Sequence, residues 1–263
     1  AFQYDDFGNV LDQIEFGEVS ANSDTGSFSD VLDDKRTAKF AYALNQEKNI
    51  VSLPSSQIIF DYQGIKIQEQ RYYYDNLPLG QTTKGSLTLK ESWLDADGSF
   101  IQTNYQYNEY GLLTKQIDPL GNSTTFQYDS FNLYPILTIN GLGFQTQYSY
   151  DYALGLPKRT IDPNNIVQEN IYDGFGRLIK VLISDQNQSP TLIVKQETLH
   201  NDFVQPVLVL QKDYFSEESN PKEVYQYFDG FGRIIQTKTS SDQANQFNAA
   251  SLIYDELGRI KKE

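Results

Sequence analysis

The sequence contains no cysteine and no methionine, and it has a single tryptophan and a single histidine. Without cysteine the chain can have no disulfide framework, no thiolate nucleophile and no cysteine zinc site. His200 stands alone, which also excludes a histidine-rich metal site. We therefore expect no bound metal and no cofactor.

Positive charge and long apolar segments are also scarce. The formal net charge of −14 at pH 7 would repel nucleic acids and anionic lipids, so neither is an expected partner. No apolar run approaches the roughly 18 residues of a membrane-spanning helix, and residues 1–5 do not read as a signal peptide. Because the chain begins within a repeat and without methionine, we expect it to be part of a longer protein.

Aromatic residues, by contrast, are abundant. They make up 14% of the chain, with 19 tyrosines and 16 phenylalanines, and such rings favour the pleated surface of a β-sheet. The hydrophobic fraction of 39% is low for a globular domain, so many rings should lie on half-exposed faces rather than in a thick core.

A motif of tyrosine, usually aspartate, two or three residues and usually glycine recurs along the chain. Tyr107, Tyr128, Tyr150 and Tyr172 follow one another at steps of 21, 22 and 22 residues. Each repeat therefore has room for two strands of about six or seven residues, which is too little for helices. The motif residues on which this interpretation depends are Tyr107, Gly111, Tyr128, Asp129, Tyr150, Asp151, Tyr172, Asp173, Gly176, Arg177, Tyr227, Gly232, Arg233, Tyr254, Asp255, Gly258 and Arg259.

A second kind of turn lies midway between the tyrosine motifs, at residues 118–122, 140–143 and 162–165. In the Tyr-Asp turns, an aspartate side chain can cap the backbone two residues on, and a glycine accepts the left-handed conformation. In the midway turns, Asp-Pro fixes φ and leaves an N–H missing where no ladder partner is required. Asn132 replaces glycine in one copy, which fits because asparagine tolerates positive φ. Most of the repeat tyrosines follow an apolar or aromatic residue two positions earlier, so a ladder of stacked rings is predicted.

The regularity differs along the chain. Residues 1–100 are predicted to be an irregular β region with loops, including the polar stretch Ser20–Lys35, whereas residues 101–263 form the regular array. An insertion at about 185–222 adds two strands, at residues 191–195 and 203–210. Hairpins are also predicted within residues 57–75 and 87–107.

Three patterns in the sequence resemble functional sites, but each is better explained by a turn. The segment Asp95–Ser99 resembles a calcium loop, but the position of the bidentate glutamate is Gln106. The Gly-Phe-Gly segments at 174–176 and 230–232 do not open a helix, so they are not phosphate cradles. A glycosidase carboxylate pair is also disfavoured, because the acidic residues mostly occupy recurring turns.

Residues 172–178 (Tyr-Asp-Gly-Phe-Gly-Arg-Leu) and 254–260 (Tyr-Asp-Glu-Leu-Gly-Arg-Ile) resemble the YD, or rearrangement-hotspot (Rhs), repeats. The run from Ile117 to Arg177 is most similar to the repeat region of the B component of insecticidal toxin complexes and of SpvB-like virulence proteins. The resemblance covers roughly residues 70–263. It implies a hollow shell, in which a spiral strip of β-hairpins encloses a toxic cargo polypeptide. The terminal segment with catalytic aspartates that self-cleaving members carry is not found in this sequence, so we transfer no catalytic residue.

We therefore expect an all-β array of antiparallel β-hairpins that forms a curved, twisted strip and acts as a non-enzymatic wall. Its partners would be the remainder of its shell and an enclosed toxin polypeptide, and its location secreted or at the bacterial surface. Unpaired terminal strands predict edge-to-edge self-association of the isolated strip. The alternative is a surface adhesin that binds glycans through aromatic residues such as Trp93 and Tyr105.

Overall fold

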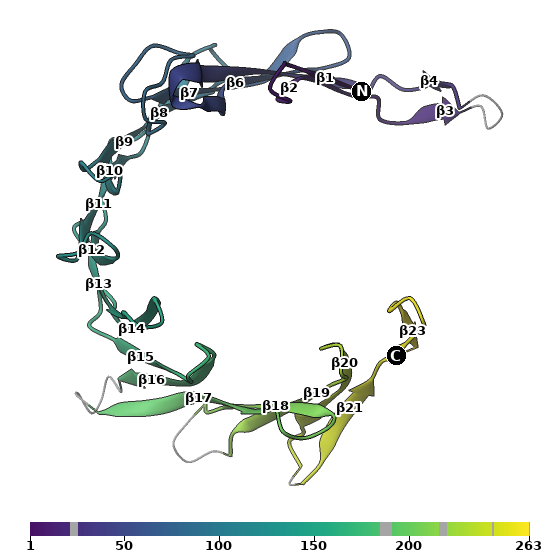
Figure 1. Cartoon of the computed structure of the whole chain (residues 1–263), viewed down its shortest axis with the longest axis vertical. Helices are drawn as coiled ribbons and strands as arrows, with labels where there is room; N and C mark the ends of the chain where they lie inside the picture. Colours follow the sequence, from purple (N-terminus) through teal and green to yellow (C-terminus); the bar gives the residue numbers. More distant parts are fainter. Residues whose placement is uncertain (22–25, 185–190, 216–219, 244, 263) are drawn as a thin grey trace. The chain divides into compact units, whose positions relative to one another are not determined.

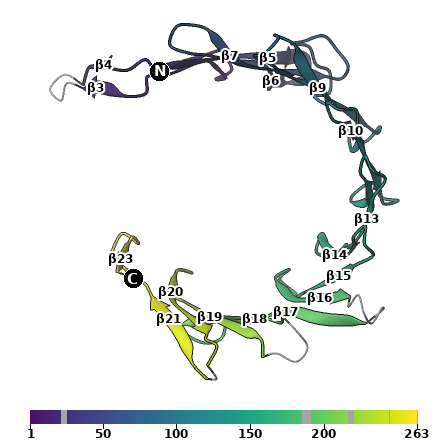
Figure 2. The ribbon, with the colours of Figure 1, turned by 180° about the vertical axis from the view of Figure 1, so that it is seen from behind.

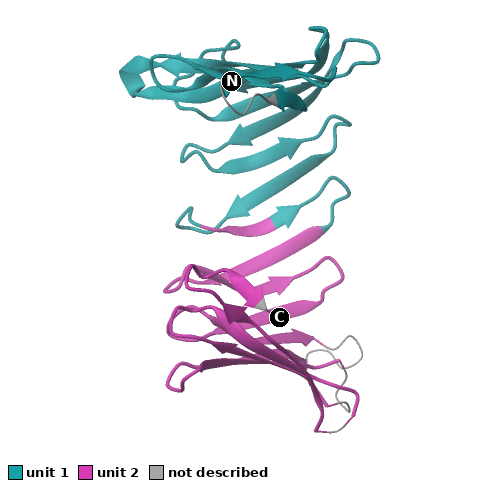
Figure 3. Ribbon diagram, turned by 90° about the vertical axis from the view of Figure 1, so that its right-hand side faces the viewer, with its two compact units in different colours: residues 1–133, 138–144 teal, residues 134–137, 145–263 magenta. Residues whose placement is uncertain are grey.

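The protein is described by a computed structural model that covers residues 1–21, 26–184, 191–215, 220–243 and 245–262. These residues form antiparallel strands and one short 3-10 helix, η1 (Gln46–Lys48), which confirms the predicted all-β hairpin array. No helix in the described ranges is long and apolar enough to cross a membrane. The chain divides into two compact units, residues 1–133 with 138–144 and residues 134–137 with 145–263 (Figure 3).

The first unit is an antiparallel meander in which each strand pairs with the next (Figure 1). Its strands are β1 (Phe2–Tyr4), β2 (Val10–Glu15), β5 (Arg36–Asn45), β6 (Ile50–Phe60), β7 (Lys66–Tyr74), β8 (Leu87–Trp93), β9 (Phe100–Tyr107), β10 (Leu113–Ile117) and β11 (Ser123–Tyr128). A separate hairpin of β3 (Val19–Ala21) and β4 (Phe28–Asp30) projects between β2 and β5.

The second unit repeats this arrangement. Its strands are β13 (Gln145–Asp151), β14 (Leu156–Ile161), β15 (Val167–Tyr172), β16 (Leu178–Ser184), β17 (Leu192–Asn201), β18 (Val207–Asp213), β19 (Lys222–Phe228), β20 (Ile234–Ser240) and β21 (Phe247–Ser251). A two-stranded hairpin, β22 (Ile253–Tyr254) and β23 (Ile260–Lys262), follows. The remaining strand, β12 (Pro135–Ile139), has residues in both units.

Each unit is built mainly as a single layer of sheet, as the two opposite views in Figures 1 and 2 show. Of the described apolar residues, only Ala43 and Tyr74 are buried. Both lie near the loop of residues 75–86, which approaches β5 through a hydrogen bond from the Leu44 N–H to the Gly80 carbonyl (3.4 Å). Elsewhere the side chains are half-buried or exposed, because no second layer covers them.

A register shift accompanies most of the repeat tyrosines. In β15, Ile171 pairs with Lys180 but Tyr172 pairs with Leu178, so one residue of β16 is bulged. Comparable shifts occur at Tyr4, Tyr74, Tyr150 and Tyr254. Because bulges bend a strand and increase its twist, they account for the way each unit bends along its own length (Figure 1).

The predicted hairpins within residues 57–75 and 87–107 are confirmed as β6–β7 and β8–β9. The prediction of a loop at Ser20–Lys35 was only partly correct, because β3 and β4 form a hairpin in this region. The strand predicted at 203–210 was misplaced: residues 202–206 form a turn with a cis Gln205–Pro206 bond, and β18 begins at Val207. The strand predicted at 191–195 is the start of the longer β17, and the loop predicted at 186–190 lies outside the described residues.

Candidate functional site

The Tyr-Asp turn at residues 173–177 joins β15 to β16 and is closed by its first side chain. Oδ1 of Asp173 accepts hydrogen bonds from the backbone N–H groups of Phe175 and Arg177, both at 2.9 Å. The N–H of Gly176 donates to the Asp173 carbonyl at 3.0 Å. Gly176 has φ of +77°, a conformation that glycine adopts without steric cost. The aspartate and the glycine therefore fix the shape of the turn together.

The midway turns have the same geometry as the Tyr-Asp turns, a unity that the sequence did not reveal. Oδ1 of Asp118 accepts the N–H groups of Leu120 (2.9 Å) and Asn122 (2.8 Å). The predicted positive φ of Asn132 is confirmed at +55°. The same pair of side-chain bonds occurs at Asp5, Asp61, Asn108, Asn140, Asp162, Asp229 and Asp255.

In three Tyr-Asp turns, an arginine side chain also donates a hydrogen bond to the second carboxylate oxygen of the aspartate. The Nε atoms of Arg177, Arg233 and Arg259 donate to Oδ2 of the turn aspartate four residues earlier, at 2.7, 2.8 and 2.8 Å. The backbone N–H of Arg233, followed by its side chain, lowers the pKa of Asp229. Arg259 lowers the pKa of Asp255 in the same way. The carboxylates of Asp229 and Asp255 are thus held ionised.

Several tyrosine hydroxyls donate a hydrogen bond to a backbone carbonyl of a preceding strand and so join neighbouring repeats. Tyr107 on β9 donates to the Leu87 carbonyl on β8 at 2.9 Å, and Tyr128 on β11 donates to the Leu113 carbonyl on β10 at 2.9 Å. Burial raises the pKa of both phenols, which keeps them protonated as donors. The other ties are Tyr42 to Val10 (2.9 Å), Tyr74 to Pro54 (2.7 Å), Tyr172 to Pro157 (2.8 Å) and Tyr254 to Ile234 (2.8 Å).

A ladder of stacked rings was predicted to hold neighbouring repeats together. In the structure, hydroxyl hydrogen bonds join the repeats instead. Ring contacts are local, as where Tyr134 stacks on Tyr150 with 4.5 Å between centroids. The Nζ atom of Lys238 lies over the Tyr227 ring, 5.1 Å from its centroid. Asn170, which interrupts the aromatic alternation, donates to the Tyr172 hydroxyl at 3.3 Å.

Two further motif aspartates accept backbone N–H groups, and three motif glycines have positive φ. Oδ1 of Asp129 accepts the Leu133 N–H, and Oδ1 of Asp151 accepts the Ala153 N–H, both at 2.9 Å. Gly111, Gly232 and Gly258 have φ of +78°, +75° and +78°.

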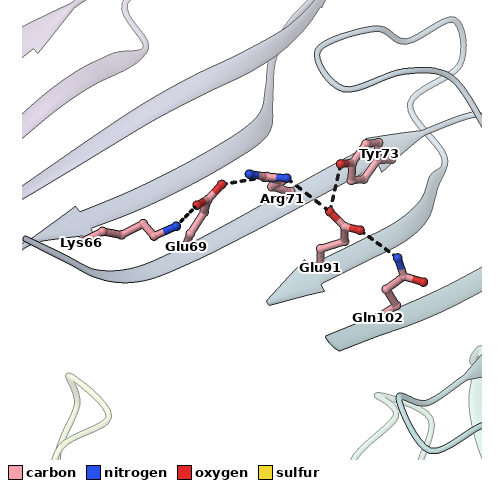
Figure 4. Close-up of polar contacts among 6 residues, drawn as sticks. All are labelled: Lys66, Glu69, Arg71, Tyr73, Glu91 and Gln102. Atoms are coloured by element: carbon pink, nitrogen blue, oxygen red, sulfur yellow. Dashed lines mark hydrogen bonds and ion pairs between the residues drawn. The ribbon is translucent and has the colours of Figure 1, made fainter. Parts of the chain in front are cut away.

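A polar network on β7, β8 and β9 contains two buried carboxylates of the first unit, Glu69 and Glu91 (Figure 4). Glu69 accepts from Lys66 Nζ at 2.7 Å and from Arg71 Nε at 2.6 Å. Glu91 accepts from the Tyr73 hydroxyl at 3.0 Å, from Gln102 at 2.9 Å, and lies 3.9 Å from Arg71.

This network does not have the properties of a glycosidase pair. Burial acts to raise the pKa of Glu69, but the hydrogen bonds from Lys66 and Arg71 outweigh it, so the pKa is lowered. A general acid needs a raised pKa, whereas Glu69 is held as an anion. Through the contacts of Glu91 with Arg71, Tyr73 and Gln102, the network joins β7, β8 and β9.

A cation lies over Trp93, one of the two aromatic residues named for glycan binding, and another lies over the nearby Phe100. Lys66 Nζ lies 4.1 Å from the centroid of the Trp93 ring, and the Arg71 guanidinium lies 4.1 Å from that of Phe100. These cations cover one face of each ring and leave less aromatic surface for a sugar.

The other candidate sites are structural. Residues 94–99 form a hairpin turn, with the Leu94 N–H donating to the Ser99 carbonyl at 2.9 Å. His200 lies on β17, opposite Val209 of β18. Within the described part of the chain, no group of three or more histidine, aspartate or glutamate side chains could hold a metal ion.

A charged ladder crosses four strands of the second unit, which the sequence reading missed. Lys180, Glu197, Lys212 and Glu223 are register partners on β16, β17, β18 and β19. Lys180 pairs with Glu197 at 2.6 Å, and Lys212 pairs with Glu223 at 2.9 Å. Only knowledge of the register could have found these pairs, because they lie far apart in the sequence.

Comparison with known proteins agrees with this geometry. Residues 107–144 match the RHS Repeat family, and no curated protein matches the chain. The crystal structure of TcdB2-TccC3 is similar, at 14% identity and a TM-score of 0.66, with 98% of this chain and 20% of that chain covered. A structure of the Photorhabdus luminescens Tc holotoxin pore is similar at 13% identity and a TM-score of 0.64, with 98% and 21% covered.

The resemblance to Rhs/YD-repeat proteins is therefore confirmed, and the fold is that of these toxin-complex structures. The chain spans about a fifth of the length of the solved chains that it matches.

Proposed function

Starting from an RHS repeat and the fold of toxin-complex proteins, we propose that this chain is a segment of a shell wall that encloses a cargo polypeptide. The wall acts by confinement: it separates the cargo from its surroundings until release. Residues 101–263 form the regular part of the wall, and residues 1–100 lead into it. The complete protein acts outside the bacterial cell or at its surface.

One observation carries this proposal: each unit is mainly a single sheet with two uncovered faces, joined repeat to repeat by tyrosine hydroxyls. A globular enzyme buries one sheet face against a second layer to form its core. Here the stabilising contacts run within the layer instead. Such a layer can extend indefinitely in one direction, which is the property that a wall requires.

The adhesin alternative lacks comparable support. A glycan platform at Trp93 needs a free aromatic face, whereas Lys66 lies over one face of the Trp93 ring. The repeated turns likewise use their carboxylates internally, so they offer few free acceptors to a sugar.

The absence of cysteine allows a direct test of the wall. Thr124 and Thr125 are neighbours on β11, so their side chains point to opposite faces of the sheet. Single Thr124→Cys and Thr125→Cys variants of the intact assembly that contains this chain are treated with a maleimide on a large polyethylene glycol. We expect one variant to react and the other to react only after denaturation.

Two controls make the result interpretable. A small maleimide should label both cysteines in the denatured assembly, which shows that both thiols are reactive. The isolated chain should react at both positions, because neither face is enclosed. Equal labelling of both variants in the intact assembly would contradict the wall and favour an open binding surface.

A further inference from the structure

The loop between β7 and β8 begins like the other Tyr-Asp turns but is longer. It spans residues 75–86, whereas the turn between β15 and β16 spans residues 173–177. In the short turn, Oδ1 of Asp173 caps the backbone. The equivalent aspartate of the long loop is Asp75, which follows Tyr74. We call residues 75–86 the Asp75 strap.

Four consecutive backbone N–H groups of the strap converge on the Asp75 carboxylate. Oδ2 accepts those of Thr83 (2.7 Å), Lys84 (2.7 Å) and Gly85 (3.0 Å), and Oδ1 accepts that of Ser86 (3.0 Å). Successive N–H groups that point into one concavity form an anion-binding nest. The strap is therefore folded around an anion that the chain itself provides.

The carboxylate in this nest is held in its charged form. Burial acts to raise the pKa of Asp75, but the backbone hydrogen bonds of the nest, that from Lys84 first, outweigh it, so the pKa is lowered. Oδ2 also accepts the hydroxyl of Thr82 at 3.0 Å, and Thr82 is only 4% exposed. The anion thus bonds to a buried side chain as well as to the backbone.

The strap lies against the hairpin of β5 and β6. Besides the backbone bond between β5 and the strap, Nδ2 of Asn45 on β5 donates to the Thr82 carbonyl at 2.8 Å. Gly85 lies close to β6, because a Cβ at this position would be 3.2 Å from Cδ1 of Leu53. The strap therefore connects the β7–β8 hairpin to β5 and β6 in addition to the ladder bonds of the sheet.

We propose that residues 82–86 are an anion nest filled by the Asp75 carboxylate, and that this anion holds the strap against β5 and β6. Asp75 is then a positioning residue. Without its carboxylate, four N–H donors lose their acceptor and the strap is released, while the strands keep their own ladder bonds. The device is independent of any enclosed cargo, so its failure would leave the proposed wall untouched.

Hydrogen exchange of the 263-residue chain, followed by mass spectrometry, tests the proposal with Asp75→Gly. Asp75 has φ of +56°, which glycine adopts without strain, so this variant loses the carboxylate and keeps the backbone conformation. We expect exchange of the strap amides to accelerate by about tenfold or more. Peptides from β7 and β8 should keep their protection.

Asp61→Gly is the matched control in the same unit. Oδ1 of Asp61 caps the ordinary turn between β6 and β7 by accepting the N–H groups of Gln63 and Ile65. Its removal should leave exchange in the strap unchanged. Equal strap exchange in wild type and Asp75→Gly would overturn the proposal. Loss of protection throughout the first unit would also contradict it, because Asp75 would then support the whole sheet rather than the strap.

Sodium formate separates the anion from other roles of the side chain. Formate supplies a free carboxylate to the empty nest, so in Asp75→Gly it should slow strap exchange by about twofold or more relative to sodium chloride at the same ionic strength. In wild type the two salts should act alike, because Asp75 already fills the nest. Formate that does no better than chloride in Asp75→Gly would show that these N–H groups do not form an anion nest.

Discussion

The hydroxyl of Tyr107 donates a 2.9 Å hydrogen bond to the backbone carbonyl of Leu87. Leu87 is the first residue of β8, directly after the loop that the preceding Tyr-Asp pair, Tyr74 and Asp75, begins. The bond therefore joins the end of one repeat to the start of the strand in the repeat before it. The recurrence of this relationship explains how a sheet without a thick core keeps its repeats in register.

Replacing Tyr107 with phenylalanine tests the contribution of this bond. The ring is retained while the hydroxyl is lost, so we expect the free energy of unfolding to fall by about 0.5–1.5 kcal/mol. Urea unfolding followed by circular dichroism measures the change. Tyr110→Phe is the control, because Tyr110 is 65% exposed at a turn tip; an equal loss in both variants would contradict the assigned role.

The turn glycines permit a comparison within one turn. Gly176 has φ of +77°, and a Cβ there would meet Leu156 only at an ordinary 3.5 Å, so Gly176→Ala should cost about 1 kcal/mol through backbone strain alone. Gly174 has open space and no positive φ, so Gly174→Ala should be neutral or slightly stabilising. Thermal unfolding distinguishes the two. A tolerated alanine at 176 would show that the turn does not need the left-handed conformation.

The turn aspartates predict a loss of stability in acid. The pKa values of Asp229 and Asp255 are lowered in the folded state, first by the backbone N–H groups of Arg233 and Arg259. A carboxylate of this kind stabilises the fold above its unfolded pKa of about 3.9, and this contribution is lost as the pH falls through the folded value.

Asp229→Asn should therefore lower the urea midpoint at pH 7, and its difference from wild type should shrink as the pH falls below the unfolded pKa of about 3.9. The asparagine keeps the backbone cap, as Asn108 and Asn140 show, but loses the charge that Arg233 binds. A difference that is constant from neutral to acidic pH would show that the ionised carboxylate contributes nothing.

The network on β7 and β8 predicts a larger effect than a surface ion pair. Glu69 is only 5% exposed and binds both Lys66 and Arg71. Glu69→Ala leaves both cations without this partner, so we expect a destabilisation of about 1–3 kcal/mol in urea unfolding. Glu109→Ala, in an exposed turn, should change the stability by less than about 0.5 kcal/mol. If Glu69→Ala and Glu109→Ala changed the stability equally, the network would not stabilise the fold.

Local chemistry made the turns predictable, whereas contacts that depend on register were not. The left-handed conformation of Asn132 and the hairpin turn at Gly64 followed from residue type alone. The Lys180–Glu197 pair and the Tyr107–Leu87 bond could not be predicted, because a bulge of one residue changes which side chains meet across two strands.

The apolar sequence around 203–210 was misleading for a related reason. The apolar segment 203–210 indicated a strand from Phe203, but the chain turns at residues 202–206 and leaves that ring in solvent. A strand pattern assumes that apolar residues find a covering layer. In a single-layer sheet this assumption fails at the turn tips.

Electron cryomicroscopy of the intact assembly that contains this chain tests the central claim most directly. We predict that residues 107–144 lie in a continuous wall one sheet thick, with one face toward solvent and the other toward enclosed polypeptide density. A map in which both faces of these strands are open to solvent, with no enclosed density, would contradict the account.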